Sequence, residues 1–123
     1  MICLDTNYLI CGLTEGTPEA MDLVAWASAG ESLITPMLAW FEFICGPVTP
    51  VQISTMEAFL LEIVVFGREQ AEEAARLFNA VERKRSLRMD SIIAGTANIA
   101  GARLATRNRL DFALFTTHGL TLV

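Results

Sequence analysis

The chain has 123 residues, of which 53% are hydrophobic and 19% charged, so it can form one domain with a core and is too apolar to be disordered. A net charge of −5 argues against a protein that holds nucleic acid by bulk positive charge. Three cysteines without a CxxC pair and a single histidine argue against a disulfide framework, a zinc ribbon and a histidine-based metal site. We expect a single domain over residues 1–123, and its high hydrophobic content favours a homodimer that buries apolar surface.

The termini and the prolines argue against export and membrane insertion. Met1 leads directly into a strand-like run without a basic segment, so no signal peptide is expected. Pro36, Pro47 and Pro50 interrupt the uncharged region around residue 42, so no membrane-spanning helix is expected there. These features predict a cytoplasmic protein with no membrane contact.

In the first half of the chain, short apolar runs alternate with helix signals. Thr17 fits an N-cap and Pro18 a first-turn position, which together mark a helix start. In chain order, the patterns predict a buried strand at 2–4, a helix opened by Asp5, a helix from 17 to 30, a strand at 32–35, a helix from 36 to 46, a helix at 49–61 and a strand at 63–66.

The second half continues this alternation. It predicts a helix at 68–85, a helix capped by Asp90 that ends near residue 101, a strand at 104–106, a short turn or helix at 108–115 and a terminal strand at 120–123. The inner face of the first of these helices is predicted to contain Ala71, Ala74, Ala75, Leu77, Phe78 and Val81. Such alternation indicates an α/β fold with a mainly parallel sheet covered by helices on both faces. In these folds, chemistry collects beyond the carboxyl ends of the strands.

Glu42 stands out because it is the only charged residue between Ser32 and Met56 and lies between two phenylalanines. An unpaired buried carboxylate is costly, so either Glu42 reaches the surface at the edge of a cleft or a positive group meets it inside. Its neighbours favour burial. Residues 1–67 contain no Lys or Arg that could pair with it.

Three aspartates complete a candidate acidic site. Taken alone, Asp5 fits a helix N-cap as well as a functional acid, Asp90 fits an N-cap better, and Asp111 fits an ordinary loop acid. Together with Glu42 they suggest carboxylates that converge on one point, where they repel one another unless a cation neutralises them. Mg²⁺ or Mn²⁺ accepts oxygen ligands and can activate water for the displacement of a phosphodiester.

Four ordered motifs resemble those of the PIN-domain ribonucleases, most closely the VapC toxins of prokaryotic toxin–antitoxin pairs. The motifs span nearly the whole chain and consist of Ile2–Asn7, Glu42, the run from Asp90 to Ala94, and the run from Leu104 to Phe112. The resemblance implies a three-layer α/β/α fold with a central five-stranded sheet in the order 3-2-1-4-5. It also implies a homodimer, a cognate antitoxin, and Mg²⁺- or Mn²⁺-dependent RNA cleavage that leaves a 5′ phosphate and a 3′ hydroxyl.

The resemblance also assigns roles to residues. Asp5 and Asp90 are expected to be the firmest metal ligands, and Glu42 to complete the pocket directly or through a bound water. Thr6 and Thr106 are expected to orient the pocket by hydrogen bonds. Many family members carry an acid where this chain has Asn108, whose neutral amide oxygen is a weaker ligand. Asp111, three residues on, is the alternative fourth ligand.

Other interpretations remain open at this point. A PIN fold without catalysis, serving as a partner-binding or RNA-binding module, is favoured by Asn108. An aspartate-based phosphatase or receiver domain is disfavoured, since position 7 is Asn and the only lysine, Lys84, follows no strand. Residues 68–109 carry a net charge of +4, with a basic run from Lys84 to Arg88 that fits either a solvated helix end or an RNA backbone contact.

Overall fold

The computed structural model describes residues 1–123. Its strands are β1 (Ile2–Leu4), β2 (Leu33–Pro36), β3 (Glu62–Val64) and β4 (Arg103–Ala105). Its α-helices are α1 (Thr6–Cys11), α2 (Pro18–Ser28), α3 (Met37–Ile44), α4 (Pro50–Phe59), α5 (Arg68–Ala80), α6 (Arg88–Ala100) and α7 (Arg109–Phe112). Two 3₁₀ turns, η1 (Arg85–Leu87) and η2 (Ala113–His118), complete the chain. The predicted alternation of strands and helices is confirmed, with most boundaries shifted by a few residues.

The sheet is parallel throughout, with its strands in the order β3-β2-β1-β4. The prediction of five strands is wrong, because residues 120–123 make only an isolated parallel bridge between Leu122 and Leu104. Both hydrogen bonds of this contact involve Leu104. Its N–H donates to the Thr121 carbonyl, and its carbonyl accepts from the Val123 N–H. Because residues 120–123 pair with only one residue of β4, they do not form a strand, yet they lie at the predicted edge of the sheet.

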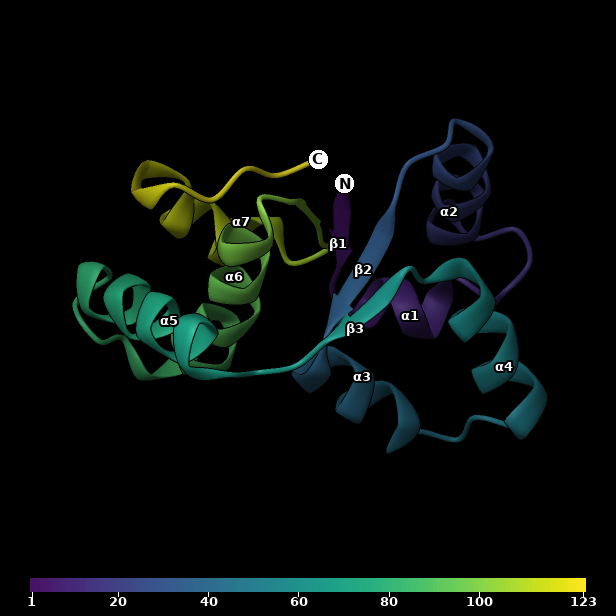
Figure 1. Cartoon of the computed structure of the whole chain (residues 1–123), viewed down its shortest axis with the longest axis horizontal. Helices are drawn as coiled ribbons and strands as arrows, with labels where there is room; N and C mark the ends of the chain where they lie inside the picture. Colours follow the sequence, from purple (N-terminus) through teal and green to yellow (C-terminus); the bar gives the residue numbers. More distant parts are fainter.

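Helices cover both faces of the sheet, which confirms the three-layer arrangement. Figure 1 shows α5 and α6 on one side of the strands and α1, α2 and α4 on the other. Successive residues of β1 point to opposite faces, so Cys3 packs under α5 and α6 while Ile2 and Leu4 pack under the other helices. Each face therefore has its own hydrophobic cluster, and the strand ends are left free at one edge.

Helices α5 and α6 pack very closely. A Cβ atom added to Gly95 would lie 2.7 Å from the main-chain nitrogen of Ala74, so only glycine fits at this crossing. Within the predicted inner face of α5, Ala74 and Leu77 are buried, whereas Ala75 is exposed. The prediction that this helix continues to residue 85 is wrong. It ends at Ala80, and the next turn includes two residues with left-handed backbone, Glu82 (φ 60°) and Arg83 (φ 55°).

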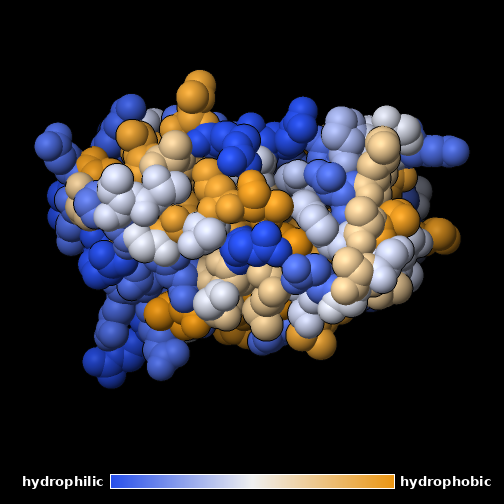
Figure 2. All heavy atoms as spheres, turned by 90° about the horizontal axis from the view of Figure 1, so that it is seen from above, coloured by the Kyte–Doolittle hydropathy of each residue, from blue (hydrophilic) through white to orange (hydrophobic).

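The surface combines charged and apolar regions. Figure 2 shows the face at the end where both termini lie, with hydrophilic side chains at the left, along the top and at the centre, and hydrophobic side chains exposed between them and at the right. Large apolar side chains are exposed on several helices, among them Ile10, Met21, Val24, Phe41, Ile44, Val51 and Leu110. No helix is both long and apolar enough to span a bilayer. The three cysteines are free.

Candidate active site

The site is built around Asp5, the first residue after β1. One carboxylate oxygen, Oδ1, accepts a hydrogen bond from the Thr6 N–H (2.7 Å), which caps helix α1. The other, Oδ2, accepts one from the Thr106 hydroxyl (2.7 Å), and this hydroxyl in turn accepts from the Asn108 N–H (3.0 Å). Asp5 is therefore both an N-cap and a buried acid held at the carboxyl edge of the sheet. Burial raises its pKa more than the hydrogen bonds from Thr106 and Thr6 lower it.

Glu42 is exposed, so its predicted burial is wrong. Helix α3 turns Ala39, Trp40 and Phe43 toward the core, and this spacing leaves position 42 on the outer face. Its Oε2 accepts a hydrogen bond from the Thr6 hydroxyl (2.8 Å). Of the two possibilities raised by the sequence, the cleft edge is the one observed: the carboxylate is exposed and so needs no buried positive partner.

Asp90 does not cap its helix, contrary to the sequence-based prediction. The η1 turn leads straight into α6, with buried Leu87 at the cap position, so Asp90 becomes the third residue of the first turn. No protein group donates a hydrogen bond to the Asp90 carboxylate, although the helix dipole favours a negative charge there. Burial first, and then repulsion from the other three predicted carboxylates, raises its pKa to about 6.

Asp111 lies slightly apart from the other acids. Its Oδ2 accepts a hydrogen bond from the Asn108 side-chain amide (3.1 Å) in the segment that follows β4. Asn108 itself lines the acidic pocket, whereas Asp111 does not. The negative charge of Asp111 still reaches Asp90, because it contributes to the raised pKa of that residue.

These residues surround one pocket of about 400 Å³ at the carboxyl edge of the sheet. Three carboxylates from three different elements, Asp5, Glu42 and Asp90, line it together with Asn108. No basic side chain lines it. The remaining lining residues are Thr6, Asn7, Ile10, Met89 and Ile93. The chain thus gathers negative charge at this point without supplying a positive group to balance it.

The donor set fits a hard divalent cation in its chemistry, since carboxylate and amide oxygens are the ligands that Mg²⁺ and Mn²⁺ prefer. As the side chains lie, no group of three or more His, Cys, Asp or Glu is arranged around a single ion position. Asp5 is fixed by two hydrogen bonds. A shared ion therefore requires Glu42 and Asp90, whose side chains lie at the protein surface or only half-buried, to turn toward it.

Several features of the site had not been predicted. Helical spacing could have identified the apolar and amide groups around the acids, because they lie three or four residues apart on α1 and α6: Asn7, Ile10, Met89 and Ile93. The ion pair between Arg107 and buried Glu19 (3.0 Å) had no comparable signal. This pair connects the segment after β4 to helix α2.

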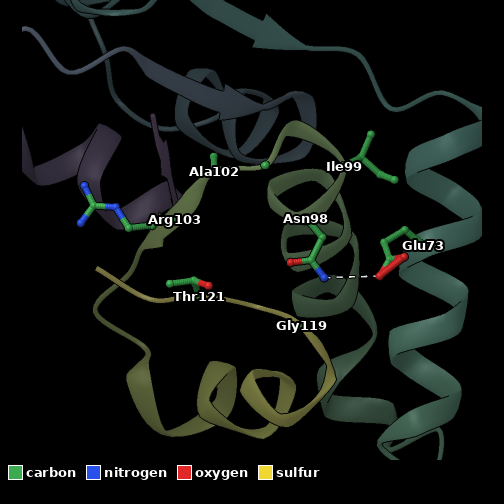
Figure 3. Close-up of a pocket in the computed structure, with 8 residues that line it drawn as sticks. Glu73, Asn98, Ile99, Ala102, Arg103, Gly119 and Thr121 are labelled. Atoms are coloured by element: carbon green, nitrogen blue, oxygen red, sulfur yellow. Dashed lines mark hydrogen bonds between the residues drawn. The ribbon is translucent and has the colours of Figure 1, made fainter.

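A second polar hollow, of about 350 Å³, is lined by residues of α5, α6 and the segments that flank β4 and η2 (Figure 3). Its acid, Glu73, forms an ion pair with Arg76 and accepts a hydrogen bond from the Asn98 amide (3.3 Å). Hydrogen bonding to Arg76 lowers the pKa of Glu73 despite its partial burial. None of the predicted site residues lies here, and its charges are already balanced.

Similar folds occur in known proteins, although no curated protein matches the chain. A toxin–antitoxin complex from Klebsiella pneumoniae contains a chain with 25% identity and a TM-score of 0.73, over 92% of this chain and 91% of that one. VapBC2 from Rickettsia felis, bound to a promoter DNA fragment, has 21% identity and a TM-score of 0.74, over 100% of this chain and 98% of that one. FitAcB from Neisseria gonorrhoeae has 18% identity and a TM-score of 0.70, over 100% of this chain and 97% of that one. The last two likenesses concern the fold alone. Residues 2–113 match the PIN domain, and the chain therefore belongs to the PIN-domain family.

Proposed function

We propose that this chain is a metal-dependent endoribonuclease and the toxin of a toxin–antitoxin pair. It would hydrolyse RNA phosphodiester bonds at a Mg²⁺ or Mn²⁺ site formed by Asp5, Glu42 and Asp90, with Asp111 or Asn108 as a further ligand. The observation that carries the proposal is a pocket lined by three carboxylates from three elements and by no basic side chain. Such a cluster is tolerable chiefly when a cation binds among the acids.

A divalent ion bound here would supply Lewis-acid chemistry, activating water and neutralising the charge that develops on the phosphate. The chain's own residues provide the geometry. Hydrogen bonds from the Thr6 N–H and the Thr106 hydroxyl hold the Asp5 carboxylate in one orientation, as outer partners of metal ligands commonly do. The Thr6 hydroxyl holds Glu42 at the rim of the pocket. Asp90, whose carboxylate has no hydrogen-bonding partner, would be free to turn toward a bound ion.

The partner proposals have separate support. Toxin–antitoxin complexes are among the solved structures that share this fold, so a cognate antitoxin is the expected inhibitor. It would cover apolar surface and place a basic side chain in the acidic pocket. The exposed apolar side chains on α2, α3 and α4 also provide surface for a homodimer.

A second candidate function is a PIN fold that binds RNA or a partner without cutting. Two observations favour it. Asn108 stands where many family members carry an acid, and no group of three acidic side chains already surrounds a single ion position. The retention of three carboxylates around one pocket weighs against it, because a binding surface gains nothing from their mutual repulsion.

The deciding experiment incubates the purified chain with a panel of RNAs in Mg²⁺, Mn²⁺ or EDTA, beside the Asp5→Asn variant. Metal-dependent cleavage by the native chain and its loss in the variant are expected. Cleavage that persists in Asp5→Asn would identify a contaminating nuclease. Tight RNA binding with no cleavage in either metal would favour the binding module instead.

A further inference from the structure

The nine basic side chains of this acidic protein divide into two groups. Four form ion pairs with Glu residues, and a fifth, Arg109, donates a hydrogen bond to the main-chain oxygen of Val123. The remaining four form no salt bridge and lie close together in sequence: Arg83, Lys84, Arg85 and Arg88. We refer to residues 82–88, which join α5 to α6, as the basic turn. Four of the five basic side chains that form no salt bridge thus lie in one segment.

The basic turn is structured rather than a frayed helix end. The Arg83 N–H donates to the Phe78 carbonyl (2.9 Å), the Leu87 N–H donates to the Lys84 carbonyl (2.9 Å), and the Leu87 side chain is fully buried. Glu82 and Arg83 adopt left-handed backbone, which is strained for a residue that carries a side chain. Strained backbone persists only where surrounding contacts determine it, and here the hydrogen bonds and the buried Leu87 side chain fix this conformation.

The same conformation holds two arginines against one aromatic ring. The guanidinium carbons of Arg83 and Arg88 each lie 5.8 Å from the centroid of Phe78. Cation–π attraction to the ring partly offsets the repulsion between the two like charges. Arg88 is only two residues from Asp90, yet it stacks on Phe78 and forms no ion pair with that carboxylate. Its charge therefore remains available to an external anion.

The basic turn adjoins the acidic pocket. It runs directly into α6, whose second and third residues, Met89 and Asp90, line that pocket. In Figure 1 the segment between α5 and α6 runs along the lower left of the molecule to the start of α6. Three carboxylates leave the pocket negative even when one divalent cation is bound, so a neighbouring cationic surface would help to hold phosphates there.

We propose that the basic turn binds the phosphate backbone of a single-stranded RNA segment immediately beside the bond to be cut. This inference rests on the proposed nuclease function. Arg83, Lys84 and Arg85 contact successive phosphates, while Arg88, stacked on Phe78, contacts the phosphate nearest Asp90. The contacts are to the backbone, so they contribute affinity and register rather than base selection.

The test measures binding of a fluorescent single-stranded RNA by anisotropy in EDTA, across a series of KCl concentrations. The native chain is compared with Arg83→Gln/Lys84→Gln/Arg85→Gln and with a control that loses the same charge, Arg68→Gln/Arg76→Gln/Arg103→Gln. Each phosphate contact contributes about 0.7 to the slope of log affinity against log salt. We expect the basic-turn variant to lower that slope by about 2 and affinity by about tenfold or more at low salt. The control should retain the native slope.

Further outcomes are equally informative. Phe78→Leu keeps every charge but removes the ring, so it should preserve the salt slope and weaken binding several-fold. Circular dichroism and thermal melts establish that each variant is folded. Equal binding by the basic-turn variant and its control would overturn the inference, even if the native chain cleaves RNA. Loss of binding to polyglutamate with RNA binding unchanged would assign the turn to an acidic protein partner and overturn it as well. The binding assay contains EDTA and does not depend on cleavage. Failure of the nuclease proposal would appear separately, as absent cleavage in the assay with Mg²⁺ or Mn²⁺.

Discussion

Asp90 and Glu73 are acids on neighbouring helices, yet the protein treats them in opposite ways. Glu73 on α5 is paired with Arg76 and receives a hydrogen bond from Asn98, and its pKa is lowered. Asp90 on α6 receives no hydrogen bond, and its pKa is raised to about 6. The chain can neutralise an acid with its own arginine where the role is structural. At the carboxyl edge of the sheet it leaves the acids unneutralised, which is expected of a site that binds a cation.

The largest expected difference is in catalysis. Asp90→Asn should reduce metal-dependent RNA cleavage by about a hundredfold or more, because a ligand and its charge are lost. Glu73→Gln should leave the cleavage rate near that of the native chain. Initial rates at saturating Mg²⁺ or Mn²⁺ test both variants together. An equal loss of cleavage in Asp90→Asn and Glu73→Gln would contradict the assignment of catalysis to the acidic pocket alone.

Metal binding should also increase the free energy of unfolding. At a concentration one hundred times its dissociation constant, Mg²⁺ or Mn²⁺ should raise the free energy of unfolding by about 2.7 kcal/mol. Glu73→Gln should show the same increase, whereas Asp90→Asn should show little. Denaturant unfolding with and without metal measures this directly. A similar increase in Asp90→Asn would place the ion elsewhere.

The hydrogen bonds around Asp5 can be tested through Thr106. Thr106→Val removes the hydroxyl that donates to Asp5 and leaves the Asn108 N–H without its acceptor. We expect a loss of about 1–3 kcal/mol in stability and about tenfold or more in activity. Thr106→Ser keeps the hydroxyl and should restore most of both. If Thr106→Val is native-like while Thr106→Ser loses stability and activity, the methyl group rather than the hydroxyl is what matters.

The smallest expected effect is on pH dependence without metal. The pKa of folded Asp90, about 6, lies above its ordinary value of 3.8, so the folded state binds more protons between these values. The free energy of unfolding should therefore fall as pH rises from about 4 to about 6, by roughly 1 kcal/mol at this solvent-screened group.

Two variants separate the contributions to that profile. Asp90→Asn should reduce the fall between about pH 4 and about pH 6, and the raised pKa of Asp5 should account for the part that remains. The lowered pKa of Glu73 acts in the opposite sense, since its stabilisation is present above 4.5 and is lost as pH falls below that value. Glu73→Gln should therefore change only the acidic end. Urea midpoints measured across this range would reveal either pattern, and a flat native profile would contradict the raised pKa that burial, and then repulsion from the other acids, gives Asp90.

Local signals were sufficient for much of the fold. The short apolar run before Asp5, the Thr17–Pro18 start of α2 and the regular alternation of strands with helices gave the parallel three-layer arrangement. The last strand was overpredicted, because an apolar run has strand character whether or not its partner offers enough hydrogen-bonding groups. The length of α5 was overpredicted as well. No glycine or proline marks the left-handed turn at Glu82 and Arg83.

The acidic site was predicted less completely than the fold. The proximity of Asp5, Glu42 and Asp90 followed from the expected sheet edge together with the family resemblance. The burial of Glu42 was inferred from neighbours in sequence, but a helix turns adjacent residues to different faces. The cap position of α6 depended on buried Leu87, which tertiary packing determines. The contact between Arg107 and Glu19 joins distant segments and left no local pattern.

The crossing at Gly95 has a consequence for both hollows. Helix α6 carries Asp90 near its start and Asn98 near its end, and the lack of space for a single methyl group at its midpoint fixes how deeply it sits against α5. A side chain at position 95 would wedge the two helices apart and displace both ends of α6 together. The positions of Asp90 in the acidic pocket and of Asn98 in the second polar hollow thus both depend on Gly95, which lines neither of them.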